Sequence, residues 1–68
     1  MKAWITRDKN GELWLHTHKP KRVSYPGGLE YWEASMNPNS SEMQILDEKL
    51  FKGLKWEDEP LRVEIKAI

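Results

Sequence analysis

The sequence predicts an α+β fold, in which a small antiparallel sheet of three to five strands packs with one short helix or helical turn. Two β-prone runs flank an Asn-Gly pair near the start of the chain, and apolar and polar residues alternate over 61–67. Between them, residues 42–52 combine a capping pattern with leucines at helical spacing. A chain of 68 residues corresponds to a single small domain, 1–68.

An N-terminal hairpin is expected over residues 2–17. Its two arms are rich in aromatic and aliphatic residues, and an Asn-Gly pair between such arms is the strongest local signal of a hairpin turn. With a type I turn and a bulge at Gly11, Trp4 would lie opposite His16. A two-residue turn would shift this pairing by one position, and the sequence leaves both registers open.

Large apolar groups are expected on both faces of this hairpin. Leu13 and Leu15 would lie on one face, and Trp4 and Trp14 on the other. A sheet with one wet face should be apolar on one side only, so both faces need a cover. A chain of this length can cover one face itself, and the other would form an interface, for which a homodimer is one solution. The candidate interface residues are Trp4, Trp14 and His16.

The segment after the hairpin is expected to contain a loop, a strand and a second loop. Pro20 cannot donate to a strand ladder, and Pro26-Gly27 is typical of a turn, so residues 23–28 are interpreted as a loop. The short aromatic run 29–34 is predicted to be a third strand. A polar loop then follows over 35–41.

Residues 42–52 allow two interpretations. The capping pattern, the leucine spacing and a glycine at the end favour a helix over this range, with Gly53 as its C-cap. In the alternative, residues 43–46 form a short strand and Asp47 caps a single helical turn over 48–51. Both interpretations place apolar residues of this segment against the sheet.

The C-terminal strand, predicted over 61–67, has the clearest pattern in the chain. Apolar residues alternate with Arg62, Glu64 and a lysine, which is typical of a strand with one wet face. Val63 and Ile65 are therefore expected to be buried.

Composition and motifs exclude several functional classes. The chain has no cysteine, which excludes disulfides and thiolate chemistry and suits the cytoplasm, the expected location. No apolar run approaches the roughly 20 residues that span a bilayer, so no membrane partner is expected. No catalytic triad context or phosphate-binding glycine motif occurs, so the chain is predicted not to be an enzyme and to use no cofactor.

Two short motifs contain residue types that occur in ion-binding sites. His16 and His18 form a His-x-His pair, but a metal site needs further ligands that no cysteine or nearby carboxylate supplies, so no metal site is predicted. The acidic run Glu57-Asp58-Glu59 would suit a cation or a basic partner. Its position before Pro60 and its lack of a calcium-loop spacing favour a solvated turn.

The charge of the chain is balanced overall but unevenly distributed. Residues 1–22 hold six basic and two acidic side chains, or +4, and residues 23–68 hold five basic and nine acidic ones, or −4. The segment 16–22 is basic and has aromatic neighbours, a mixture suited to phosphate contact and base stacking. A weak nucleic-acid-binding module is therefore the alternative function, although a chain without net charge disfavours it. Its candidate contacts are Lys19, Lys21 and Arg22.

Several motifs resemble those of a group of short proteins. They are Ala3-Trp4-Ile5-x-Arg7-Asp8-x-x-Gly11-x-Leu13, Lys19-Pro20, an isolated Trp32, and Leu50-Phe51-x-x-Leu54-x-Trp56-Glu57-Asp58-Glu59-Pro60-x-x-Val63. In this pattern the chain resembles short uncharacterised proteins of gut Bacteroides-type bacteria and their phages. The resemblance covers most of the chain and implies a phage-related accessory role without an assigned activity. That group is expected to have a proline soon after the Leu-Phe pair, where this chain has Lys52-Gly53.

These features together predict a non-enzymatic protein-binding or interaction module. The chain has four tryptophans, and each can bury about 150–250 Å² in a core or an interface. Its partner would be a second copy of the chain or another protein.

Overall fold

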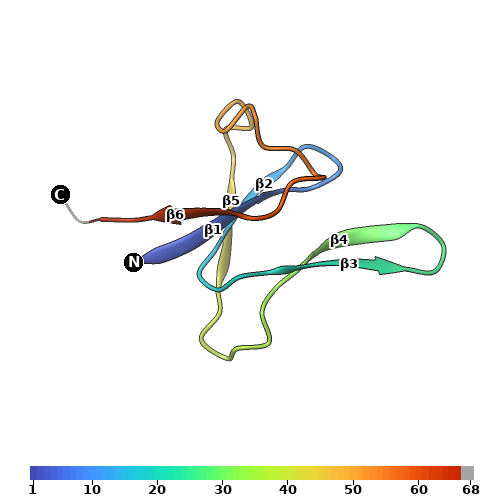
Figure 1. Cartoon of the computed structure of the whole chain (residues 1–68), viewed down its shortest axis with the longest axis horizontal. Coiled ribbons are helices and arrows are strands. Elements are labelled where there is room, and N and C mark those ends of the chain that lie inside the picture. Colours follow the sequence, from blue (N-terminus) through green and yellow to red (C-terminus); the bar gives the residue numbers. More distant parts are fainter. Residues whose placement is uncertain (67–68) are drawn as a thin grey trace.

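The structure is a computed structural model that describes residues 1–66, and these residues form six β-strands and no helix (Figure 1). The strands are β1 (Lys2–Arg7), β2 (Leu13–His16), β3 (Lys21–Tyr25), β4 (Leu29–Glu33), β5 (Glu42–Ile45) and β6 (Leu61–Glu64). A four-stranded antiparallel sheet has the order β5-β2-β1-β6, and β3 and β4 form a separate two-stranded sheet. The fold is therefore all-β, and the prediction of an α+β fold is wrong.

The segment 42–52 contains a strand followed by turns, so the expected helix or helical turn is also wrong. β5 pairs with β2, with Met43 opposite Leu15. Local helix propensity is worth only tenths of a kcal/mol per residue, and completing the apolar sheet outweighs it. The short strand of the alternative interpretation is confirmed. Hydrogen-bonded turns follow it, including a 3.2 Å bond from the Leu50 N–H to the Asp47 carbonyl oxygen.

The left-handed residue of the following loop is Phe51, and not the expected C-cap Gly53. Phe51 has φ = 53°, whereas Gly53 is not among the residues with positive φ. A bulky side chain rarely adopts this conformation, because its Cβ approaches the neighbouring carbonyl oxygen. The loop must therefore be held in place by contacts strong enough to offset this strain.

The β1–β2 hairpin has the register expected for a turn with a bulge at Gly11, which is confirmed. Trp4 lies opposite His16, and Gly11 has φ = 95°. The Asp8 N–H donates a 2.8 Å hydrogen bond to the Glu12 carbonyl oxygen and closes the hairpin. The positive φ explains why a glycine is required at this position.

β3 is a strand where the sequence predicted a loop over 23–28. It pairs with β4, and the positive φ values of Gly27 and Gly28 make the turn between them. Val23 lies opposite Tyr31, and pairs of β-branched and aromatic residues stabilise antiparallel strands. The third strand expected over 29–34 is confirmed at Leu29–Glu33.

The core of the protein is small and is centred on β1. The buried side chains are Ala3, Ile5, Thr6, Leu13, His16, Pro20 and Trp32. Val63 is only half-buried and Ile65 is 43% exposed, so the expectation that both are buried is wrong. β6 is an edge strand. The alternation of apolar and polar residues distinguishes its two sides, but it does not show whether the rest of the chain covers the apolar side. β6 ends at Glu64, and position 67 of the predicted strand lies outside the described residues.

Candidate functional site

The four-stranded sheet has one aliphatic face and one polar and aromatic face. Residues directly opposite each other in antiparallel strands point to the same side, so the register assigns each side chain to a face. We define the aliphatic face as the side that carries Ile5. Its apolar members are Ala3, Ile5, Leu13, Leu15, Met43, Ile45, Leu61 and Val63, with Ile65 continuing the alternation, and Arg7 lies on the same side, opposite Leu13.

Arg7 fastens the loop 47–54 over one end of the aliphatic face. Its Nε donates to the Leu54 carbonyl oxygen at 2.6 Å, and its Nη2 donates to those of Leu50 and Phe51 at 3.0 and 3.2 Å. Its Nη1 donates to the carbonyl oxygen of Gly11 at 2.7 Å, in the β1–β2 turn. Hydrogen bonds from a charged donor are among the stronger ones, so one side chain holds both segments together.

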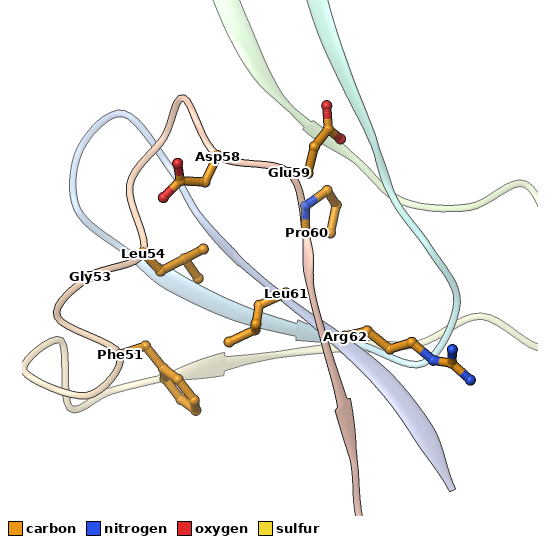
Figure 2. Close-up of a pocket in the computed structure, with 8 residues that line it drawn as sticks. All are labelled: Phe51, Gly53, Leu54, Asp58, Glu59, Pro60, Leu61 and Arg62. Atoms are coloured by element: carbon orange, nitrogen blue, oxygen red, sulfur yellow. The ribbon is translucent and has the colours of Figure 1, made fainter.

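A cleft of about 470 Å³ opens between this loop and the start of β6 (Figure 2). Figure 2 shows Leu54 and Leu61 directed toward one another with the Phe51 ring below them, while Arg62 extends away. Asp58 and Glu59 lie on the rim. The cleft therefore has an apolar floor with acidic groups beside it.

A smaller cleft of about 210 Å³ lies at the other end of the aliphatic face. It is lined by Met1, Leu15, Met43 and Ile65, with Glu42 among its polar neighbours. Met43 is 60% exposed, Ile65 43% and Leu61 40%. The aliphatic face is thus open at its two clefts, whereas Ala3 and Ile5, which lie between them, are buried.

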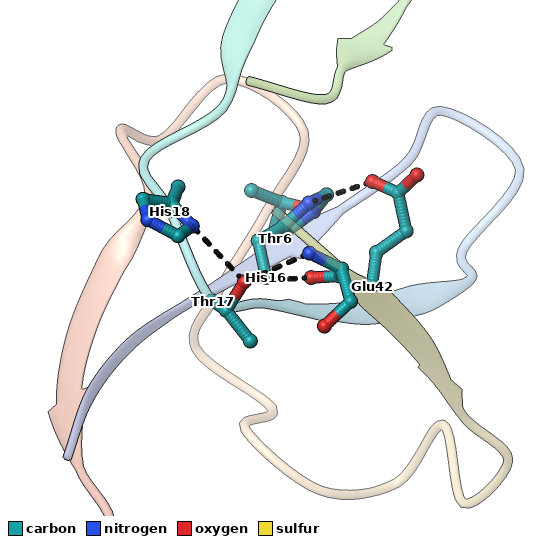
Figure 3. Close-up of polar contacts among 6 residues, drawn as sticks. Thr6, His16, Thr17, His18 and Glu42 are labelled. Atoms are coloured by element: carbon teal, nitrogen blue, oxygen red, sulfur yellow. Dashed lines mark hydrogen bonds and ion pairs between the residues drawn. The ribbon is translucent and has the colours of Figure 1, made fainter. Parts of the chain in front are cut away.

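The opposite face contains a buried polar cluster around His16 (Figure 3). Its Nε2 lies 3.0 Å from the Thr6 hydroxyl, and its Nδ1 lies 3.3 Å from Glu42 Oε2. The second contact has ion-pair distance, but its angle is outside hydrogen-bond geometry. Burial lowers the pKa of His16 below its usual value, and the Glu42 carboxylate acts against this shift.

The two histidines of the His-x-His pair do not converge on one point. His18 Nδ1 lies 3.1 Å from the Thr17 hydroxyl, whereas His16 faces Thr6 and Glu42 (Figure 3). Within residues 1–66, no three His, Asp or Glu side chains form a group suited to a metal ion.

The three candidate interface residues lie on the polar and aromatic face. His16 is 3% exposed, and Trp4 and Trp14 are half-buried. Trp14 Nε1 is buried without a hydrogen-bond partner among the described residues. Their role in an interface stays a prediction, and their burial favours the aliphatic face as the contact surface. Sequence reasoning assigned Ile65 of that face to the core, although the alternation did identify its apolar side.

The structure does not bring the three candidate nucleic-acid contacts together. Lys19 and Lys21 are exposed, but the Arg22 guanidinium lies 4.7 Å from the Trp32 ring and 5.0 Å from the Trp56 ring. Its Nη2 also donates to the carbonyl oxygens of Trp56 and Asp58, at 2.6 and 2.8 Å. Arg22 therefore links the two-stranded sheet to the loop before β6.

The two-stranded sheet has an exposed aromatic pair on its outer side. The rings of Tyr25 and Tyr31 stack with their centroids 5.8 Å apart. The hydrogen bond to Tyr31, together with the nearby Glu33 carboxylate, raises the pKa of Tyr25 to about 12. These are small surface contacts without a cleft, and they indicate no ligand.

Comparison of the chain with protein-family models, with curated proteins and with solved structures found no match. The part of the chain that the structure describes contains no helix long and apolar enough to cross a membrane.

Proposed function

We propose that this chain is a non-enzymatic protein-interaction module that binds an extended, basic and amphipathic segment of another protein on its aliphatic face. The observation that carries this proposal is the pair of apolar clefts on this face, whose lining residues Met43, Leu61 and Ile65 are 60%, 40% and 43% exposed. Exposed apolar patches usually mark an interaction site.

The charges in the two clefts support the choice of a basic partner. The charged side chains that line the two clefts are Glu42, Asp58 and Glu59, against one cation, Arg62. An extended segment with alternating apolar and basic residues would place its apolar side chains in the clefts and its basic side chains near these carboxylates. The lack of cysteine suits a reducing compartment, and we place the module in the cytoplasm. An accessory role in a phage or its host is compatible with a module that acts through protein contacts.

The test is a titration followed by ¹H–¹⁵N NMR, with a short synthetic peptide of alternating Leu and Lys as the probe. We expect the largest shift changes at Phe51, Leu61 and Ile65. A peptide of the same composition in scrambled order should bind more weakly, because its apolar side chains no longer share one face. An alternating Leu and Glu peptide tests the charge argument and should also bind more weakly.

The matched variants are Ile65→Asp on the aliphatic face and Leu29→Asp on β4, where Leu29 is 61% exposed. Both should remain folded, because neither side chain is buried. Ile65→Asp should abolish the shift changes, and Leu29→Asp should retain them. Absence of binding by the parent chain, or loss of binding in the Leu29 variant alone, would overturn the proposal.

A further inference from the structure

The outer edge of β6 has backbone groups without a strand partner. The Ile65 N–H donates to the Met1 carbonyl oxygen at 2.7 Å, so the backbone of Ile65 faces β1. Backbone direction alternates along a strand, so Val63 faces β1 as well, and Arg62 and Glu64 direct their N–H and C=O groups outward. Within residues 1–66, no strand pairs with this edge. Exposed strand edges of this kind are templates for pairing with another chain.

We propose that β6 pairs in antiparallel orientation with β6 of a second copy, about a two-fold axis at Val63. The two four-stranded sheets then form one continuous sheet. Arg62 lies opposite the partner's Glu64, and Glu64 lies opposite the partner's Arg62. This inference goes beyond the proposed function, because it rests on the strand edge and not on the clefts.

The charges of Arg62 and Glu64 and the position of Pro60 favour this register over the alternative registers. Outward-facing residues must pair with outward-facing residues, so the alternative registers differ by two positions. One of them places Arg62 opposite the partner's Arg62 and Glu64 opposite the partner's Pro60, which has no N–H. The other places Glu64 opposite the partner's Glu64. Of these three registers, the one centred on Val63 pairs Arg62 with the partner's Glu64 on both sides of the axis, and it satisfies the outward N–H and C=O groups of both residues with residues of β6 itself.

The charges of β6 are available for this pairing. Arg62 and Glu64 are exposed, and neither belongs to the ion pairs formed among the described residues. Exposed ion pairs contribute only about 0–1 kcal/mol, so they select the register more than they add affinity. Affinity would come from the ladder of backbone hydrogen bonds between the two β6 strands.

The other edge of the sheet lacks this complementarity. The Thr17 N–H donates to the Ser41 carbonyl oxygen, so the outward residues of β5 are Glu42 and Gln44. No basic residue is available there to face Glu42, which already lies 3.3 Å from His16. The β6 edge is therefore the one suited to self-association.

A single cysteine tests the geometry directly, because the chain has none of its own. In the proposed pair, Val63 faces the partner's Val63 at a non-hydrogen-bonded position, where the Cα atoms lie about 4.5 Å apart. This separation is compatible with a disulfide. We expect Val63→Cys to form a covalent dimer under mild oxidation at low concentration. Leu29→Cys is the control, because it is more exposed and would cross-link faster by random collision alone.

Charge reversal tests the register. Sedimentation equilibrium should show a dissociation constant at least about tenfold larger for Arg62→Glu and for Glu64→Arg, because each change places like charges opposite each other. The double variant restores unlike pairs and should return to the parent value. Equal cross-linking of the two cysteine variants, or no rescue in the double variant, would overturn the inference. Peptide binding by a monomeric chain would leave the proposed function standing while removing this pairing.

Discussion

The Nε atom of Arg7 lies 2.6 Å from the Leu54 carbonyl oxygen, to which it donates a hydrogen bond. The same guanidinium also donates to the carbonyl oxygens of Gly11, Leu50 and Phe51. One cation thus joins the first turn of the chain to a loop that is distant in sequence. The large cleft exists because this loop lies over the sheet.

Replacement of Arg7 by lysine should lower the free energy of unfolding by about 2 kcal/mol, because a single ammonium cannot bind several diverging carbonyls. Urea denaturation of a dilute sample would measure the change. Arg62→Lys is the matched control and should stay within about 0.5 kcal/mol of the parent, since Arg62 is exposed. Equal midpoints for the two variants would show that Arg7 does not hold the loop.

The Phe51→Gly variant should be more stable than the Phe51→Ala variant. Both substitutions remove the ring, but only alanine keeps the Cβ that conflicts with φ = 53°. The glycine variant should therefore exceed the alanine variant by about 1 kcal/mol in free energy of unfolding. Thermal unfolding followed by circular dichroism would compare the pair. The reverse order would mean that the left-handed backbone conformation costs nothing here.

The hairpin could be predicted from the sequence because its determinants are local. Asn10 and Gly11 define the turn, and the turn sets the register of the strands that it joins. The segment 42–52 could not be assigned in this way, because its local signals favour a helix. The strand forms there because β2 presents an open apolar edge, and that edge is visible only in the folded sheet.

The candidate site was visible in part. The alternation around Ile65 correctly marked an apolar side, but a strand pattern does not show whether another layer covers that side. The role of Arg7 was hidden for a different reason, because its partners are backbone carbonyls and carry no residue-specific signal. The turn signal Pro26-Gly27 does not show where the preceding strand ends, so the sequence does not reveal that Val23 belongs to β3.

Arg22 should contribute to stability and not to nucleic-acid binding. Arg22→Gln removes the contacts with Trp32 and Trp56 and should cost about 1–2 kcal/mol in free energy of unfolding. Lys21→Gln is the control and should change stability little: both side chains are exposed, but the contacts with Trp32, Trp56 and Asp58 belong to Arg22. Tryptophan fluorescence during urea denaturation would measure the stability of both variants. A salt-dependent affinity for single-stranded DNA that both variants reduce equally would favour the nucleic-acid alternative instead.

The stability of the fold should depend on pH because His16 is buried. Its pKa lies below the usual value of 6.5, first because burial disfavours the charged ring, with Glu42 acting in the opposite direction. The unfolded chain therefore binds a proton at a higher pH than the folded chain. The stability from this site is fully present above about pH 6.5 and is lost as the pH falls from there through the folded-state pKa.

Urea midpoints measured from about pH 8 down to about pH 5.5 should accordingly be flat at first and then fall. Glu42→Gln removes the group that raises the pKa of His16, so its midpoint should fall more steeply with acidification. Burial raises the pKa of Asp8 above its usual 3.8, which gives a pH effect of opposite sign, and an Asp8→Asn background separates the two. A flat profile, or a shallower fall for Glu42→Gln, would show that His16 is not held neutral by the fold.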